Sequence, residues 1–125
     1  MPFAAVMPAP HQAVEIREFA EPDLAPGGML LQTEYSEVCG TDGRLSGVPY
    51  PIIPGHVSVG HADKIRGEVI GGDGQRLKEG DRIVFFDVHR TCGRCYACAV
   101  SGTPTKCPSR KVYGITDGAN DGLFG

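Results

Sequence analysis

Short stretches in which apolar and polar residues alternate, separated by glycines and prolines, run along most of this chain. Residues 14–17 alternate apolar with charged side chains, which predicts a half-buried edge strand, and the turn-rich stretch 21–28 ends it. The pattern in residues 29–38 predicts the next strand, which ends next to Cys39. Alternation along this strand is expected to place Leu31, Thr33 and Tyr35 on the same face. Both segments are therefore expected to form β structure.

The same pattern continues until a segment rich in cysteine and glycine interrupts it. Residues 57–70 are β-prone, and residues 71–74, Gly-Gly-Asp-Gly, have the chemistry of a hairpin turn. The apolar run within 82–88 predicts a strand that is buried on both faces. From 89 to 108 the apolar periodicity vanishes, so this segment cannot build a core of its own. The chain is expected to be mainly β.

Length and composition narrow the range of functions. The chain has 125 residues, of which 41% are hydrophobic and 22% charged, and this fits one folded domain. Its 18 glycines and 10 prolines are spread throughout, which disfavours a helix bundle. A net charge of -3 without a cluster of Lys or Arg disfavours binding to nucleic acid or to an anionic membrane.

The apolar runs also bear on location and on the state of the five cysteines. None approaches the roughly 18 residues that span a bilayer, and the N-terminus lacks the basic start of a secretory signal. A cytoplasmic location is therefore expected. In a reducing compartment five cysteines, four of them close together, are expected to be metal ligands or free thiols rather than disulfides.

Four cysteines follow the spacing Cys92-x2-Cys95-x2-Cys98-x8-Cys107. A zinc ion bound by four thiolates would cross-link this segment and leave no open position for water or substrate. We expect a structural zinc site that stabilises a lobe of about residues 89–113 and performs no chemistry.

An iron–sulfur cluster and free thiols are the alternatives for these cysteines. Pro108 follows Cys107, as a proline follows the last cysteine of bacterial ferredoxins. Ferredoxins, however, space that fourth cysteine three residues on and carry ligands for a second cluster, whereas here the gap is eight and only Cys39 remains. The spacing therefore favours zinc.

A second pair of metal-binding side chains lies at predicted strand ends. Cys39 follows one strand in the sequence Cys-Gly-Thr-Asp, and His56 precedes another in Pro-Gly-His. Either residue alone is more often a small core thiol or an ordinary histidine than a ligand. With the later cysteine cluster and Glu79-Gly80-Asp81-Arg82-Ile83-Val84, however, the chain resembles zinc-dependent medium-chain alcohol and polyol dehydrogenases over nearly its whole length.

This resemblance implies a fold and a ligand set. The implied fold is a GroES-like, partly open β-barrel from which the structural-zinc lobe protrudes. By the same resemblance, Cys39 and His56 bind a catalytic zinc that acts as a Lewis acid on the substrate oxygen, with hydride passing to NAD or NADP. Thr41 would hydrogen-bond that oxygen, or else cap nearby backbone. Asp42 would accept a hydrogen bond from the His56 ring nitrogen that faces away from zinc, or else be an ordinary turn aspartate.

Three positions depart from the family pattern. Val57 follows the motif histidine where the family has a glutamate, and valine cannot coordinate a metal. Arg44 stands where a proton-relaying histidine is often found, and arginine does not shuttle protons near neutral pH. His61 and His89 are conceivable replacements for that relay. The last gap of the cysteine cluster is eight residues instead of the more usual seven, which we interpret as a loop variation.

The length of the chain sets a further expectation. Members of this family carry a Rossmann domain whose Gly-x-Gly-x-x-Gly turn binds the dinucleotide, and the sequence 72–77, Gly-Asp-Gly-Gln-Arg-Leu, ends in leucine and is interpreted as a hairpin turn. We therefore expect a domain that spans 1–125 and lacks the cofactor domain. The third ligand of the catalytic zinc is expected beyond Gly125, and the chain alone is expected to be inactive.

The expected partner is a small-molecule alcohol or polyol, and for the full-length protein both a monomer and a homo-oligomer stay open. A function from another class is a non-catalytic, zinc-stabilised β module for binding or oligomer contacts, which Val57 and the missing cofactor domain would favour.

Overall fold

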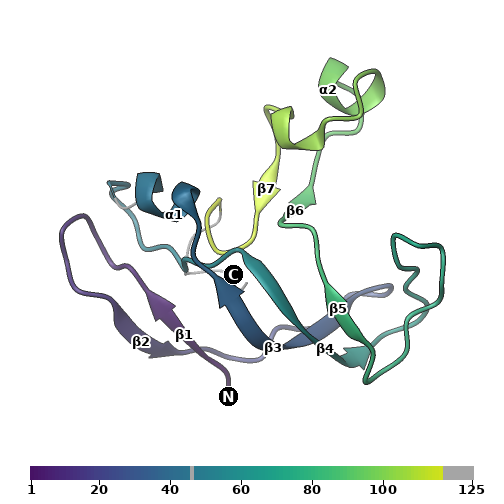
Figure 1. Cartoon of the computed structure of the whole chain (residues 1–125), viewed down its shortest axis with the longest axis horizontal. Coiled ribbons are helices and arrows are strands. Elements are labelled where there is room, and N and C mark those ends of the chain that lie inside the picture. The colour runs from purple at the N-terminus through teal and green to yellow at the C-terminus, as the bar shows by residue number, and fades with distance from the viewer. Residues whose placement is uncertain (46, 117–125) are drawn as a thin grey trace.

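The structure is a computed structural model, and it describes residues 1–45 and 47–116. These residues form a mainly β fold with two short α-helices and one 3-10 turn (Figure 1). Along the chain the elements are β1 (Phe3–Val6), β2 (Glu15–Glu18), β3 (Met29–Glu37), α1 (Gly40–Leu45), β4 (Val57–Ile65), β5 (Arg82–Val84), β6 (Val88–Arg90), α2 (Tyr96–Ala99), η1 (Pro104–Lys106) and β7 (Lys111–Val112). The expected mainly β class is confirmed. The end of the expected domain, 117–125, lies outside the described residues.

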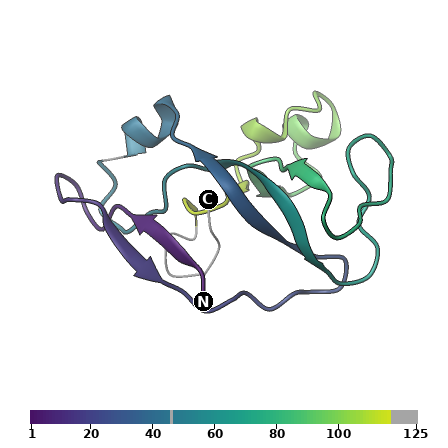
Figure 2. The same cartoon turned by 60° about the horizontal axis from the view of Figure 1, so that its bottom comes forward.

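An antiparallel sheet of three strands in the order β3-β4-β5 forms the centre of the fold (Figure 2). The β3–β4 pairing runs from Met29 opposite Ile65 to Glu37 opposite Val57, so the C-terminal end of β3 lies beside the start of β4. At Gly60 the two backbones lie close together, since a Cβ there would stand 2.0 Å from the Gln32 carbonyl oxygen. Only glycine fits this position without a shift of the strands.

A separate two-stranded sheet, β1–β2, carries the small buried core. Val6 is fully buried and packs in one cluster with Ile53, against which Ala4 and Phe19 also lie. Backbone hydrogen bonds in both directions between Met7 and Ile52, of 2.9 and 3.1 Å, join this sheet to the segment that leads to β4. The core thus lies directly beside the loop that contains His56.

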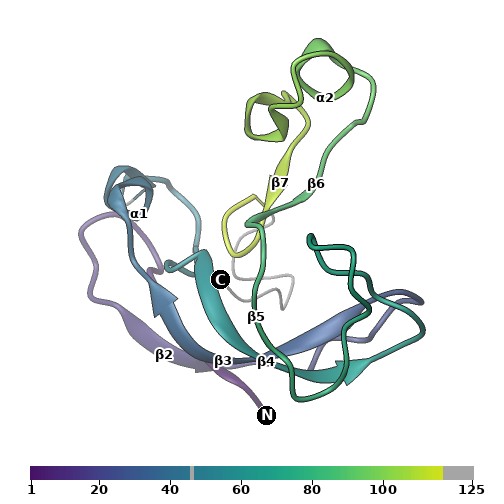
Figure 3. The ribbon, with the colours of Figure 1, turned by 45° about the vertical axis from the view of Figure 1, so that its right-hand side comes forward.

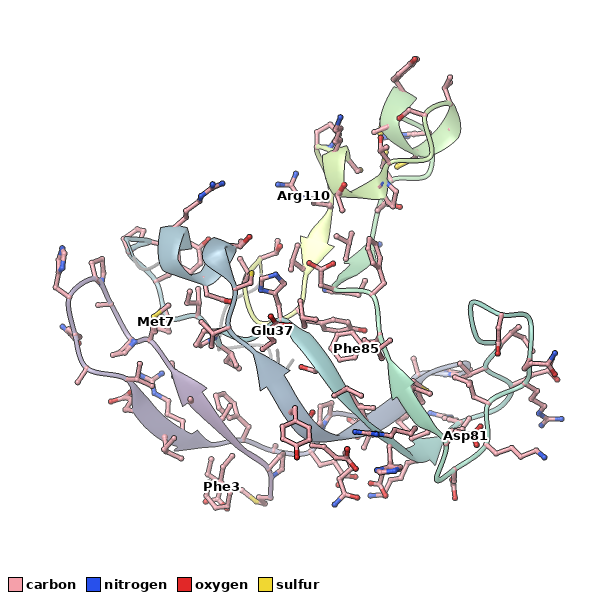
Figure 4. All side chains as sticks on the ribbon, viewed as in Figure 1. Phe3, Met7, Glu37, Asp81, Phe85 and Arg110 are labelled. Atoms are coloured by element: carbon pink, nitrogen blue, oxygen red, sulfur yellow. The ribbon has the colours of Figure 1, made fainter. Side chains whose placement is uncertain are left out.

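Strands β6 and β7 pair antiparallel and, together with α2 and η1, form a lobe that stands away from the central sheet (Figure 3). Aromatic side chains pack at its base: the rings of Phe85 and Tyr113 meet edge to face with centroids 5.0 Å apart, and His89 stacks on Tyr113 at 4.4 Å. Phe85 is labelled in Figure 4 between β5 and the lobe. This lobe contains the segment 89–108, for which we expected a metal cross-link from the sequence.

Two expectations about strand faces are wrong. Residues 14–17 do contribute to a strand, β2, but its apolar side chain faces outward, because Ile16 is paired with Ala5 and is 70% exposed while Arg17 is paired with the inner residue Ala4. The apolar run in 82–88 yields only the three-residue β5, and it is not buried on both faces, since Val84 is 68% exposed. In both cases the register of strand pairing and the position at a sheet edge determine which side chains are buried, and both depend on residues far away in the sequence.

The pattern in 29–38 was only partly right. The strand forms over Met29–Glu37, but bulges at Leu30/Leu31 and at Thr33/Tyr35 interrupt its alternation. Leu31 is half-buried, whereas Thr33 and Tyr35 are exposed, so the three do not share one environment.

Residues 71–74 form the predicted turn. The Gly74 N–H donates to the Gly71 carbonyl at 2.9 Å, and the Gly71 N–H donates to the Gln75 carbonyl at 2.8 Å. The next element after this turn is strand β5 and not a helix, which agrees with its interpretation as a hairpin rather than a dinucleotide-binding loop. Among the described residues, no helix is long and apolar enough to cross a membrane.

Candidate functional site

Cys39 lies between the end of β3 and the start of α1, in a turn that Asp42 closes. The Asp42 N–H donates to the Cys39 carbonyl at 3.1 Å, and the Cys39 N–H donates to Asp42 Oδ2 at 2.7 Å. An aspartate three residues along the turn thus satisfies backbone donors that would otherwise have no partner at the strand end. Glu37, the last residue of β3, is labelled in Figure 4 close to this turn.

His56 lies immediately before β4, in a loop held against the end of β3. The Ser36 hydroxyl donates to the Gly55 carbonyl, and the Gly55 N–H donates to Asp42 Oδ1 at 3.1 Å. Because β3 and β4 are antiparallel and pair up to Glu37 opposite Val57, the residues that flank this pair come together. Local hydrogen bonds and strand register therefore place His56 next to Cys39.

The side chains of Cys39 and His56 meet at a distance that one ion can bridge. The Cys39 Sγ lies 3.7 Å from His56 Nε2, and the ligand atoms of Cys39, Asp42 and His56 all lie within 4.8 Å of one another. Tetrahedral zinc bonds of about 2.3 Å to sulfur and about 2.0 Å to nitrogen separate those two ligand atoms by about 3.5 Å. Thiolate and imidazole are also ligands that zinc prefers, so this pair fits a zinc ion.

Asp42 faces the other nitrogen of the imidazole. Its Oδ1 lies 3.4 Å from His56 Nδ1, and the two side chains are nearly inaccessible, at 2% and 6% exposure. Burial disfavours ionisation of this carboxyl, but the backbone N–H groups of Cys39 and Gly55 and the His56 ring outweigh it and hold the pKa of Asp42 below its ordinary value. A buried carboxylate at Nδ1 fixes the ring so that Nε2 faces Cys39.

A further carboxylate that sequence reasoning missed approaches the same ring. Asp87 lies between β5 and β6, and its Oδ2 is 3.6 Å from His56 Nε2, the nitrogen that faces Cys39. Asp87 follows an apolar run and belongs to no motif with metal-ligand spacing, so the sequence alone gave no reason to place it near His56. Only the fold brings it to His56.

The remaining residues considered from the sequence lie as follows. Thr41 is exposed in α1, and its N–H donates to Cys39 Sγ at 3.4 Å. Arg44 is in the last turn of the same helix and is exposed. Two histidines are engaged elsewhere, because His61 Nδ1 lies 2.9 Å from Glu34 on the central sheet and His89 stacks on Tyr113 at the base of the lobe. Val57, at 38% exposure, begins β4.

The four cysteines of the lobe also converge. Their sulfurs all lie within 4.8 Å of one another, with Cys95 and Cys98 at 3.5 Å and Cys92 and Cys107 at 3.7 Å. Two thiolates on one tetrahedral zinc lie about 3.8 Å apart, so the arrangement matches a closed four-sulfur site. All five cysteines of the chain, these and Cys39, are free of disulfide bonds.

The thiols of the lobe differ in their tendency to ionise. The backbone N–H groups of Arg94 and Cys95 point at Cys92 Sγ and lower the pKa of Cys92 to about 6. A backbone N–H from Cys98 also favours the thiolate of Cys95, but burial and the neighbouring thiols outweigh it and raise the pKa of Cys95 to about 11. Thiolates that lie side by side repel one another, and a divalent metal ion bound between them would offset their negative charge.

The family model named alcohol dehydrogenase GroES-like domain matches residues 25–125. An alcohol dehydrogenase of Rhizobium meliloti (strain 1021) is 35% identical over 127 residues, a match that spans 97% of this chain and 35% of that protein.

Solved structures show the same likeness. The crystal structure of an alcohol dehydrogenase from Thermotoga maritima is 39% identical with a TM-score of 0.78, and the match covers 90% of this chain and 32% of that one. A short chain alcohol dehydrogenase from E. coli CFT073, in complex with NADH, is 26% identical with a TM-score of 0.64, over 93% of this chain and 33% of that one. The chain thus spans about a third of the length of these relatives.

Proposed function

The chain belongs to the family of alcohol dehydrogenase GroES-like domains, and from this premise we propose that it is the catalytic-domain part of a zinc-dependent oxidoreductase. The reaction proposed is the transfer of hydride between an alcohol or polyol and NAD or NADP. The observation that carries the proposal is the meeting of Cys39 Sγ and His56 Nε2 at 3.7 Å. The similarity to alcohol dehydrogenases from several organisms supports the enzyme class and disfavours a non-catalytic β module.

Cys39 and His56 would hold the catalytic zinc. When bound, zinc supplies Lewis-acid chemistry to an alcohol or carbonyl oxygen. Asp42 keeps the proton of the imidazole on Nδ1 by accepting it in a hydrogen bond, so that Nε2 offers its lone pair toward Cys39. The two hydrogen bonds from Cys39 and Gly55 hold Asp42 in that orientation.

Thr41 is the residue proposed to meet the substrate oxygen. It follows Cys39 by two positions, its backbone already donates to Cys39 Sγ, and its side chain is exposed. A hydroxyl can accept the proton of an alcohol and pass it onward to solvent, which is the first step that alcohol oxidation needs. Arginine at position 44 does not relay protons, so the onward path is proposed to run directly to water.

The lobe would hold a second zinc with a structural role. Its four sulfurs form a closed shell, and such sites contribute to folding rather than to chemistry. The lobe has no buried apolar cluster in its helices, since neither α2 nor η1 contains a buried residue. Cross-linking by metal would compensate for that lack.

The nicotinamide cofactor is proposed to bind mainly to residues outside this chain. NADH is bound by the E. coli relative, of which this chain matches a third. The 125 residues contain no Gly-x-Gly-x-x-Gly turn with which to hold a dinucleotide. The chain by itself is therefore expected to leave nicotinamide cofactors unreduced in the presence of zinc and alcohols or polyols.

Metal analysis of the intact protein tests the proposal. Two zinc ions per chain are expected, and Cys39→Ser or His56→Gln should lower the count to one and abolish alcohol oxidation. Thr105→Ala, an exposed substitution in η1, serves as the control and should keep both ions and the activity. One zinc per chain that neither Cys39→Ser nor His56→Gln affects would contradict the proposal and favour the β module.

A further inference from the structure

The charges of this chain are divided unevenly between the lobe and the rest. Residues 88–113 contain five Lys and Arg and no Asp or Glu, whereas residues 1–87 contain 13 Asp and Glu and seven Lys and Arg. A zinc ion on four thiolates would carry a charge of about −2, so the lobe would keep a positive excess with the metal bound. The lobe is therefore a cationic surface on an acidic chain, and such a surface attracts an anionic partner.

A hollow of about 440 Å³ opens on the lobe, lined by residues of α2, of η1 and of the segments beside them. Tyr96, which is 73% exposed, and Pro108 give it apolar walls, and Lys106 lines it as well. The hydroxyls of Ser101 and Thr103, also in the lining, hydrogen-bond to each other at 2.6 Å. The hollow thus combines apolar surface with an ammonium group that has no acidic side chain of the lobe to pair with.

The outer face of the β1–β2 sheet presents the complementary side chains. Phe3 and Glu18 are cross-strand partners and share this face, and the next pair on it is Ala5 with Ile16. Phe3 is 67% exposed and Ile16 70%, whereas Val6, on the opposite face, is fully buried. Glu18 is exposed, and within the described residues it takes part in no ion pair. An aromatic ring and a carboxylate therefore lie side by side on an open surface.

These two surfaces do not meet within one chain. The lobe and the β1–β2 sheet lie on opposite sides of the molecule (Figure 1 and Figure 2). A second copy can bring them together, because a ring beside a carboxylate matches an apolar hollow that contains an ammonium group. Aromatic anchors are enriched at protein interfaces, and opposite charges beside them select the partner. The apolar walls of the hollow favour such a protein partner over a polyanion, which the charge of the lobe alone would also attract.

We propose that the intact protein self-associates through these two surfaces. Phe3 of one copy enters the hollow of another, and Glu18 beside it pairs with Lys106. Because the contact joins two different surfaces, a pair of copies related by a two-fold axis contains it twice. The contact uses neither Cys39 nor His56, so it does not depend on the proposed chemistry.

Sedimentation velocity of the intact protein at several concentrations measures this association. The parent should associate, and more weakly at about 500 mM than at about 50 mM NaCl, because salt screens charge pairs at the edge of a contact. Phe3→Ala should weaken association by about 10-fold or more, since the hollow loses its buried ring. Lys106→Glu and Glu18→Lys should each weaken it by about 10-fold or more, since like charges then face each other.

Mixing these two charge variants isolates the contact between copies. Lys106→Glu and Glu18→Lys should associate with each other to within about threefold of the parent affinity, because every lobe in the mixed pair faces a sheet of opposite charge. Lys78→Glu, the same change at an exposed lysine outside both surfaces, is the matched control and should associate as the parent does. A far-ultraviolet circular dichroism spectrum equal to that of the parent verifies that each variant is folded.

Three results would overturn the proposal. The first is a parent that stays monomeric, or a mixture that associates no better than either charge variant alone. The second is unchanged self-association of Phe3→Ala together with lower stability, which would mean that residues outside this chain cover Phe3. The third is a Lys106→Glu variant that self-associates as the parent does but no longer binds duplex DNA, which would identify a polyanion as the partner of the lobe.

Discussion

Gly55 lies so close against Ser36 that a Cβ built on it would stand 2.5 Å from the Ser36 Oγ. Its φ of +86° is also one that side chains rarely adopt. Two physical constraints therefore require glycine next to His56, where the loop crosses the end of β3.

Gly55→Ala is expected to destabilise the protein by about 2 kcal/mol or more, since strain in the left-handed region adds to a steric clash. It should also release zinc from the Cys39–His56 site, because the loop that positions His56 must shift. Urea denaturation and zinc analysis measure the two effects. Gly72→Ala, where a Cβ meets nothing within 4 Å, is the control and should change neither. Equal stability of the two variants would contradict this account of Gly55.

Asp42→Asn is expected to weaken Zn²⁺ binding at the Cys39–His56 site by about 10- to 100-fold, the range typical for a residue that orients a ligand. The amide can accept only one of the two backbone hydrogen bonds that the carboxylate accepts from Cys39 and Gly55. When Co²⁺ replaces zinc at this site, its ligand-field spectrum should keep its shape, because Asp42 orients His56 and does not bind the metal. A Co²⁺ spectrum that Asp42→Asn changes would contradict this positioning role of Asp42.

Cys95→Ser is expected to remove one zinc per chain and to loosen the lobe without emptying the Cys39–His56 site. The reason is that the lobe is held by its four sulfurs, while the central sheet has its own strand pairing. Hydrogen exchange should accelerate at the backbone of β6, α2 and β7, and remain slow in β3 and β4. Unchanged exchange in the lobe after loss of its zinc would show that the metal is not what holds it.

Burial raises the pKa of Tyr113 above its ordinary value of 10. As the pH rises through 10, the unfolded chain loses this proton before the folded chain does, so the folded state loses stability until the pH passes the folded pKa. The free energy of unfolding should therefore fall with pH in the parent relative to Tyr113→Phe, which lacks this group. Denaturation of both proteins at several pH values between about 9 and 11 tests this.

An ultraviolet titration gives an independent check on Tyr113. The other three of the four tyrosines, Tyr35, Tyr50 and Tyr96, are exposed by 69%, 43% and 73%, whereas Tyr113 is half-buried. A late ionisation step that is present in the parent and missing in Tyr113→Phe is expected. A parent protein that lacks this late step would contradict the raised pKa of Tyr113 at the base of the lobe.

The sequence by itself determined those features whose parts lie close together along the chain. The four lobe cysteines fall within sixteen residues, so their spacing alone restricts them to one neighbourhood. The turn at 71–74 follows from local glycine and aspartate chemistry, and the strands at 29–38 and 57–70 follow from alternation over several residues. The mainly β class and the likeness to zinc-dependent dehydrogenases rest on such local patterns and on their order.

Only the tertiary structure decided which strand faces are buried and which distant side chains meet. Ile16 and Val84 look like core residues in the sequence but are exposed, because pairing register and sheet edges, not local alternation, set their environment. Cys39 and His56, 17 residues apart, meet because antiparallel pairing aligns the two strand ends. Asp87 reaches His56 only because the chain between β5 and β6 passes that ring, a contact between residues 31 positions apart that no linear spacing encodes.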